Sequence, residues 1–290
     1  MKIAYLILVH KEPEQIIGLI NKISVGSSVH CFVHIDSNSK CCCNLIENEV
    51  VGGSIYSIYN TPWGSFNTVK AELFLINKAL EWQADRLVML SGQDYPIKEN
   101  DFIINFFAKH RDIGFVEGEK MPIESWSEHQ GGLYRVNRIY FRFARKWRAF
   151  PMHTKKKPLN SFFNGMAKLL HNLFLKSSLI PIYYNGSHWW AITKEQAAYV
   201  LKLSIDKSIL KAFKYSINSD ETFVPSILYN SPKNKFKLKS APIHFLKGLN
   251  KSAHADILDE KDFSGITSSQ FLFARKMDFI KSKNLIKLLN

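Results

Sequence analysis

The stretch Ile3-Ala4-Tyr5-Leu6-Ile7-Leu8-Val9 opens the chain with seven consecutive apolar residues. A second run, Leu87-Val88-Met89-Leu90, has the same aliphatic character. Short runs of this kind predict strands that are buried on both faces, as parallel strands are when helices cover both sides of a sheet. The first run is also far shorter than the roughly 20 apolar residues that cross a bilayer. We therefore expect the chain to begin with a buried strand of an α/β sheet.

Strand-like and helix-like segments alternate along the chain, which predicts a mixed, mostly parallel central sheet flanked by helices. The expected strands are Ile3–Val9, Val29–Ile35, Ser54–Tyr59, Arg86–Leu90, Ile113–Glu117 and one around Trp189–Thr193. The expected helices open at Pro13 and near Asp220, and span Val69–Trp82, Asp101–Lys109, Asn160–Leu175 and Lys194–Leu203. We expect a single domain over residues 1–290, with a long irregular excursion at 118–158.

Composition limits the classes of partner. The 290 residues carry a formal net charge of +14, from 39 Lys+Arg against 25 Asp+Glu. Such a surface attracts phosphate groups or an anionic membrane face. Nucleic acid is not expected, because no zinc-finger or RNP-type aromatic signature occurs. The four cysteines have neither disulfide-framework nor zinc-ligand spacing, and no signal peptide precedes them, so we expect a cytoplasmic protein.

The segment 135–157 is unusually basic and aromatic. This mixture suits contact with anionic headgroups at a membrane surface, contact with an acidic acceptor, or a solvated basic face. Its cations are Arg135, Arg138, Arg142, Arg145, Lys146, Arg148 and Lys155-Lys156-Lys157. Among them we expect Arg135 to contact a substrate.

Polar residues follow two expected strands at their carboxyl ends, where ligands bind in open α/β sheets. His34 and Asp36 can hold a ribose or base edge, although an Asx turn that closes the strand explains them as well. Gly92 permits a close backbone approach to a ligand, and Asp94 lies in the same turn. We predict that these four residues lie near a nucleotide.

Two segments join glycine to tryptophan, as carbohydrate platforms often do: Trp63-Gly64 and Gly186-Ser187-His188-Trp189-Trp190. We expect Trp63, Ser187, Trp189 and Trp190 to border the sugar or the acceptor. Adjacent strand residues face opposite sides of a sheet, so one of the two neighbouring tryptophans is expected in the core.

Two charged pairs carry the chemistry. Glu221, in Ser219-Asp220-Glu221, is the candidate general base for an attacking hydroxyl, and Asp220 a substrate contact. The alternative is a carboxylate that interacts with a helix dipole. Arg275-Lys276 can compensate the charge on a leaving diphosphate, a role that metal ions fill elsewhere. The chain contains no Asp-x-Asp motif. No helix-spaced ligand pair occurs among His10, His34, His188, His244 and His254, so we expect no metal and no cofactor.

Six motifs occur in order: His34-Ile35-Asp36, Trp63-Gly64, Leu90-Ser91-Gly92-Gln93-Asp94-Tyr95-Pro96, Gly186-Ser187-x-Trp189-Trp190, Ser219-Asp220-Glu221 and Phe273-Ala274-Arg275-Lys276. Together they resemble the core-2/I-branching β-1,6-N-acetylglucosaminyltransferase family, which also includes peptide O-xylosyltransferases. The resemblance runs from Lys2 to about Asp278.

This resemblance implies a GT-A-like fold without a metal-binding acidic motif. It also implies inverting, metal-independent transfer of a sugar, N-acetylglucosamine or xylose, from a UDP-sugar to a hydroxyl of a glycan or glycolipid. Glu221 would be the base, and Lys276 with Arg275 would bind the diphosphate. Asp36 and the Gly92 turn would lie near the nucleotide.

The chain departs from that family in two respects. A second phosphate-binding arginine precedes the lysine in animal members, and here Lys251 or His254 would replace it. Animal members also have a membrane anchor and disulfides, neither of which we expect in this chain. This departure favours a bacterial enzyme of surface polysaccharide or glycolipid synthesis, cytoplasmic or peripheral at the inner face of the membrane. Two alternatives remain: a non-catalytic module that binds sugar nucleotides or polyanions, and a glycoside hydrolase using Asp94 and Glu221.

Overall fold

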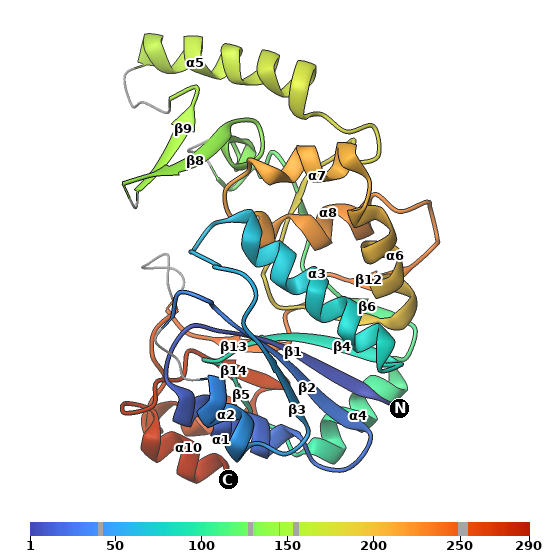
Figure 1. The fold of residues 1–290 in the computed structure, drawn as a ribbon, viewed down its shortest axis with the longest axis vertical. Coiled ribbons are helices and arrows are strands. Elements are labelled where there is room, and N and C mark those ends of the chain that lie inside the picture. Colours follow the sequence, from blue (N-terminus) through green and yellow to red (C-terminus); the bar gives the residue numbers. More distant parts are fainter. Residues whose placement is uncertain (40–42, 127–129, 145, 153–156, 249–254) are drawn as a thin grey trace.

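The computed structural model describes residues 1–39, 43–126, 130–144, 146–152, 157–248 and 255–290. A seven-stranded sheet lies at its centre (Figure 1). Its strands are β1 (Ile3–Val9), β2 (Val29–Ile35), β3 (Gly53–Tyr56), β4 (Arg86–Ser91), β6 (Ile113–Phe115), β11 (Ala191–Thr193) and β12 (Lys237–Lys239). The strand order is β12-β6-β11-β4-β1-β2-β3, and only the pairings of β11 with β4 and β6 are antiparallel. The mixed, mostly parallel sheet expected from the sequence is confirmed.

Successive residues of β1 enter two separate cores, one on each face of the sheet. Ile3 and Tyr5 pack in the first core, whereas Ala4 and Leu6 pack in the second. The first core is covered by α1 (Pro13–Ile23), α2 (Cys43–Glu49), α4 (Asn100–Lys109), α9 (Phe263–Ser268) and α10 (Lys283–Leu289). The second is covered by α3 (Phe66–Glu81), α6 (Lys194–Ser204), α7 (Lys207–Lys214) and α8 (Phe223–Tyr229). Helices on both faces explain why every position of this strand is apolar.

The buried guanidinium of Arg86, at the start of β4, reaches across the antiparallel strand β11 to the backbone at the start of β6. Its Nη1 donates to the carbonyl oxygen of Ile113 at 2.7 Å, and its Nη2 donates to that of His110 at 2.7 Å. Nη1 also donates to the Ala191 carbonyl oxygen at 3.3 Å, so both terminal nitrogens of the guanidinium are paired, which lowers the cost of burying the charge. Arg86 thereby holds β6 at the correct distance from β4.

A small second sheet positions the carboxyl-terminal cations. It consists of β13 (His244–Leu246), β14 (Phe273–Arg275) and β5 (Tyr95–Pro96), in that order. Because β5 follows β4 after a short turn, its pairing with β14 brings Arg275 to the carboxyl end of β4. A two-stranded sheet of β7 (Glu119–Lys120) and β10 (Tyr184–Asn185) lies on the other side of the site.

The expectation of an irregular excursion at 118–158 is wrong in part. β8 (Ile139–Phe143) and β9 (Lys146–Phe150) form an antiparallel hairpin, in which Tyr140 is opposite Ala149 and Arg142 is opposite Trp147. The 3₁₀ turn η1 (Leu133–Arg135) precedes this hairpin. Cross-strand side-chain pairs stabilise such a ribbon without the aliphatic pattern of a buried strand.

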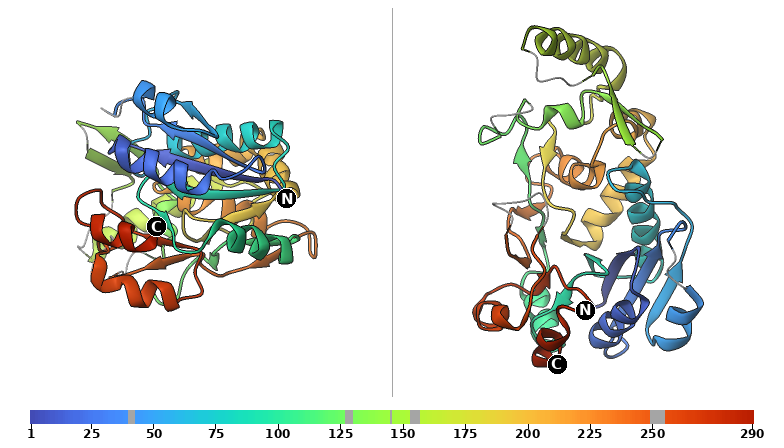
Figure 2. Two further views of the ribbon diagram at one scale, coloured as in Figure 1. Left: turned by 90° about the horizontal axis from the view of Figure 1, so that it is seen from below. Right: turned by 90° about the vertical axis from the view of Figure 1, so that its left-hand side faces the viewer.

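Beyond the hairpin lies α5 (Lys157–Leu170), which continues into a π-helical turn, η2 (His171–Leu175). We call β8, β9, α5 and η2 the distal arm, because they lie together at the end of the molecule opposite α10 (Figures 1 and 2). Across the residues described, no helix has the length and apolar character that spanning a membrane would require.

Candidate active site

A cleft of about 610 Å³ collects residues that are far apart in the sequence. It contains Glu221 and Arg135 as well as the cation pair Arg275-Lys276. The remaining lining residues are Glu117, Gly118, Glu119, Trp126, Asn185, Gly186, Ser187, His188, Trp189, Ser240, Leu246 and Ala255. The fold thus brings the two charged pairs that the sequence singled out into one site.

Glu221 lies at the end of η3 (Ser219–Glu221), a 3₁₀ turn just before α8. Its backbone carbonyl accepts a hydrogen bond from the Gly186 amide at 2.9 Å. A Cβ at position 186 would lie 2.0 Å from the Glu117 carbonyl oxygen, so glycine is required for this close approach. The Glu221 side chain is 32% exposed and opens into the cleft. Burial raises its pKa, although Arg135 opposes the shift.

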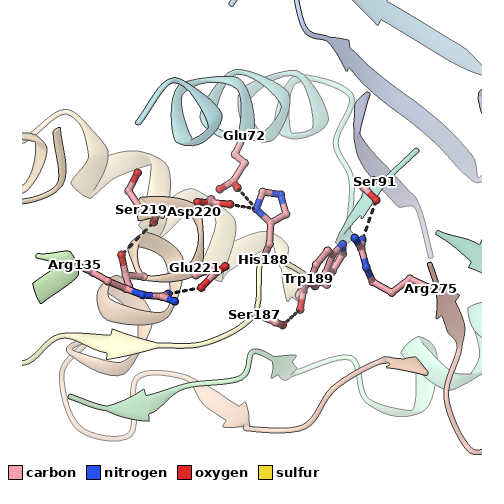
Figure 3. A network of polar contacts seen from close by, with 11 residues as sticks. Glu72, Ser91, Arg135, Ser187, His188, Trp189, Ser219, Asp220, Glu221 and Arg275 are labelled. Carbon is pink, nitrogen blue, oxygen red and sulfur yellow. Dashed lines mark hydrogen bonds and ion pairs between the residues drawn. The ribbon is translucent and has the colours of Figure 1, made fainter. Parts of the chain in front are cut away.

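Arg135 holds the Glu221 carboxylate from η1. Its Nη1 donates to a Glu221 carboxylate oxygen (Figure 3). The same nitrogen donates to Asn185 Oδ1 at 2.8 Å. Its guanidinium also lies over the Trp126 ring, 5.1 Å from the centroid. The structure shows that Arg135 orients the candidate base, whereas its expected contact with a substrate stays a prediction.

A buried network that the sequence analysis missed lies directly behind Glu221. His188 Nδ1 lies 2.9 Å from Asp220 Oδ2 and 3.3 Å from Glu72 Oε1 of α3 (Figure 3). Burial alone lowers the pKa of His188, but the two carboxylates outweigh it and raise this pKa to about 9. Burial raises the pKa of Glu72, while His188 opposes that shift. Asp220 therefore contacts His188, and His188 in turn lines the cleft.

The opposite end of the cleft is cationic. Arg275 Nη1 donates to Ser91 Oγ at 3.0 Å, and its guanidinium stacks 3.8 Å from the centroid of the Trp189 ring (Figure 3). The same nitrogen donates to Asp94 Oδ1 at 2.8 Å. Asp94 is 0% exposed. Burial raises its pKa, but Arg275, His244 and the Ser91 amide outweigh burial and lower it overall. Asp94 thus acts on the cleft through Arg275.

Lys276 is half-buried and completes this cationic end. Its pKa is lowered by burial and by the neighbouring charges of Lys11 and Arg275. Arg275 and Lys276 line the cleft together, an arrangement that suits a diphosphate, whereas the Lys11 ammonium is paired with Glu12 Oε1 at 2.6 Å. Lys11 was not predicted, although its place just after the first strand could have indicated it.

Two predicted nucleotide contacts stabilise the loop after β2. His34 is 1% exposed, and its Nε2 accepts the amides of Ile58 and Tyr59 at 3.3 and 3.0 Å. This burial corrects its expected contact with a nucleotide. Asp36 Oδ1 accepts the Asn38 amide at 2.9 Å, which is the Asx turn that the sequence left as an alternative. Asp36 remains partly exposed, so its nucleotide contact stays a prediction.

Gly92 is explained by packing rather than by a ligand. A Cβ at this position would lie 2.2 Å from Ile16 Cδ1, and the Gly92 carbonyl accepts Gln15 Nε2 at 2.7 Å. Glycine here lets α1 approach the turn after β4 closely. Its expected role at a nucleotide therefore stays a prediction, and the helix contact supplies a sufficient reason for the residue.

The tryptophans separate into core and surface positions. Trp190 is 0% exposed in the second core, which corrects its expected sugar contact, whereas Trp189 lines the cleft. Ser187 also lines the cleft, and its Oγ donates to the Trp189 carbonyl at 3.0 Å. Trp63 is 68% exposed and outside this lining, and its carbonyl accepts Trp147 Nε1 at 2.9 Å. Lys251 and His254 lie outside the described residues.

Among the residues for which the structure gives a description, no three or more His, Cys, Asp or Glu side chains are arranged to hold a metal ion.

An acidic residue and two cations share one cleft at the carboxyl edge of a mostly parallel sheet, where ligands bind in such folds, and the cations suit a leaving group on which negative charge develops. The chain belongs to the core-2/I-branching enzyme family, whose model matches residues 3–255. Enzymes of this family are glycosyltransferases that use nucleotide-sugar donors and are metal-independent. Arg275 and Lys276 lie beyond the matched residues.

Curated relatives include xylosyltransferase 1 of Homo sapiens, which is 22% identical over 247 residues. That alignment covers 80% of this chain and 22% of the human protein. Xylosyltransferase 2 of Canis lupus familiaris is 22% identical over 246 residues, with coverage of 80% and 25%. The chain therefore spans about a quarter of the length of these relatives.

Proposed function

We propose that this protein is an inverting glycosyltransferase with a GT-A-like fold, which transfers a sugar from a UDP-sugar to a hydroxyl of a glycan or glycolipid. N-acetylglucosamine and xylose are the proposed donor sugars, and the similarity to xylosyltransferases supports xylose. The proposed setting is bacterial surface polysaccharide or glycolipid synthesis at the inner face of the membrane, with residues 1–290 acting as one domain.

The observation that carries this proposal is the shared cleft. Glu221 and the pair Arg275-Lys276 are separated along the chain by α8, β12, β13 and α9, yet line the same cavity. A transferase needs a base on the acceptor side and positive charge on the leaving-group side of the sugar. This geometry supplies both.

The proposed reaction is a single displacement at the anomeric carbon. The acceptor oxygen forms a bond to this carbon while its proton passes to a Glu221 carboxylate oxygen. The bond between the anomeric carbon and the diphosphate oxygen breaks, and UDP leaves with the electron pair. Arg275 and Lys276 stabilise the negative charge that develops on that oxygen. Because its pKa is raised, Glu221 accepts the proton more readily than an exposed glutamate would.

The geometry disfavours the hydrolase alternative. A glycosidase needs two carboxyl groups that flank the bond to be cleaved, and Asp94 is fully buried behind Arg275. A non-catalytic binding module would bind the sugar nucleotide without transferring the sugar, so an assay of sugar transfer distinguishes it from a transferase.

Calorimetric titration of UDP tests the donor site, first with EDTA and then with Mn²⁺, with ADP as the control. We expect uridine-selective binding that persists in EDTA and weakens in Lys276→Gln. Binding only with Mn²⁺ would overturn the metal-independent mechanism, and equal affinity for UDP and ADP would overturn the uridine donor. A donor screen with radiolabelled UDP-sugars then distinguishes a transferase from a binding module.

A further inference from the structure

Helix α5 carries an apolar stripe that faces solvent. Leu159, Phe162, Met166 and Leu169 follow one another at spacings of three and four residues, which places them on one side of the helix. Phe162 is 64% exposed and Leu169 is 58% exposed. Leu173, in the π-helical turn, continues this exposed apolar surface. We call these five residues the α5 stripe.

The helix is nevertheless attached to the rest of the protein by its other side. Ala167 is fully buried, and the buried Arg138 donates through Nη2 to Asn164 Oδ1. These contacts orient α5 so that the stripe points outward. An apolar surface left exposed on a positioned helix indicates a partner that covers it.

The neighbouring hairpin adds more apolar surface of the same kind. Phe141, Phe143, Phe150 and Met152 are each at least half exposed. A recess of about 570 Å³ in this surface is lined by aromatic residues together with Arg148. The hairpin and α5 lie together at one end of the molecule (Figures 1 and 2).

Charge identifies the partner. Residues 129–193 contain eleven Lys and Arg and no Asp or Glu, so this segment accounts for most of the net charge of +14. Arg142, Lys146, Arg148 and Lys168 of the arm are exposed. A second copy of the chain would bring two such cationic surfaces together without any carboxylate to pair them, which is unfavourable. The partner that complements the arm has an anionic outer layer over an apolar interior, as a bilayer with acidic headgroups has.

We propose that the distal arm docks on an anionic lipid bilayer, with the α5 stripe inserted among the headgroups and the hairpin cations against the lipid phosphates. An amphipathic helix with cations at its polar edge binds membranes in this orientation. Arg135, which holds Glu221, lies four residues before β8. Docking would therefore place the catalytic cleft close to the lipid surface. This inference does not rest on the proposed reaction.

Vesicle flotation with the purified full-length protein tests the docking. We expect co-flotation with vesicles of phosphatidylcholine and phosphatidylglycerol at a salt concentration near 0.15 M, where the Debye length is about 8 Å, and little with phosphatidylcholine alone. The double variant Phe162→Ser/Leu169→Ser should lower the partition coefficient at least about tenfold. Neutralising Arg142 or Arg148 to Gln should lower it about fivefold each.

Matched controls lie at other exposed places. Ile205→Ser removes an apolar side chain that is 77% exposed, and Lys283→Gln and Lys287→Gln remove exposed cations from α10 at the other end of the molecule. These variants should float as the parent protein does. Absence of flotation on anionic vesicles, or equal loss in stripe and control variants, would overturn the proposal. A dimer in light scattering that the stripe variants dissociate, without vesicle binding, would show instead that the stripe joins two copies.

Discussion

The catalytic cleft and the distal arm are both rich in arginine and aromatic side chains, but they use them in opposite ways. In the cleft, Arg275 is held by Asp94 and stacks on Trp189, and Arg135 is paired with Glu221. On the arm, cations and phenylalanines are exposed to solvent. The comparison shows that similar composition can serve a fixed reaction site in one place and an external surface in the other.

The difference has a physical origin in burial. A charge removed from water must be paired with good geometry, so the side chains of the cleft are held in one arrangement before any substrate arrives. Preorganised charges of this kind stabilise a transition state without further reorganisation. Exposed charged side chains stabilise one another only weakly. They can therefore bind an external partner without the loss of strong contacts within the protein.

The largest effect should come from Glu221→Gln. The amide keeps the shape of the side chain but accepts a proton poorly, so turnover should fall by roughly 10²- to 10⁴-fold. Steady-state transfer assays measure the loss, and UDP calorimetry provides the control, because donor affinity should remain nearly unchanged. Near-normal turnover would mean that Glu221 only pairs with Arg135 and caps the site.

Arg275→Gln should have the next largest effect, on stability. Asp94 is fully buried and would lose its charged partner, which typically costs about 3–5 kcal/mol of unfolding free energy. Urea denaturation measures this change. The half-exposed neighbour Lys276 supplies the comparison, since Lys276→Gln should cost less than about 1 kcal/mol while still weakening UDP binding. Equal destabilisation by the two variants would contradict the assigned pairing.

The sequence predicted the sheet well because its signal is local. The strands Ile3–Val9 and Val29–Ile35 were predicted with the observed bounds, since continuous apolar residues suit strands covered on both faces. The β8–β9 hairpin was not predicted, because its local sequence lacks the usual signal of a hairpin turn. Its turn contains Ala144, with φ of 49°, instead of the glycine or asparagine that usually indicates a hairpin turn.

The site was predictable where its residues lie next to one another in the chain. Glu221 and Arg275 were singled out from motifs, whereas Glu72 was not. Glu72 stands within the amphipathic helix α3, where a glutamate ordinarily faces water, and only the tertiary packing places it against His188. The predicted nucleotide contact of His34 was wrong because the sequence around a histidine at a strand end does not show that backbone amides of a distant segment occupy its Nε2.

Glu72→Gln tests whether the network behind Glu221 is electrostatic. The folded-state pKa of His188 is raised from 6.5 to about 9, so its contribution to stability is complete below pH 6.5 and is lost as the pH rises through 9. The pKa of Glu72 is also raised in the folded state, so its contribution to stability likewise falls as the pH rises. Removing this carboxylate should reduce the loss of stability across that range by roughly 1–3 kcal/mol. Urea unfolding at several pH values measures it, with Glu81→Gln, which removes an exposed carboxylate from the same helix, as the charge control. An unchanged slope would refute the coupling.

The smallest effect should come from the arm. Phe162→Ser/Leu169→Ser removes side chains that are already in contact with water, so the unfolding free energy should change by no more than about 0.5 kcal/mol per site. Turnover on a water-soluble acceptor should also be retained. The matched core change Phe223→Ala, at a residue that is 0% exposed beside Glu221, should instead cost about 3–5 kcal/mol. A comparable loss in the arm variant would mean that the stripe already packs within the fold, and the distinction between a prearranged cleft and a free docking surface would fail.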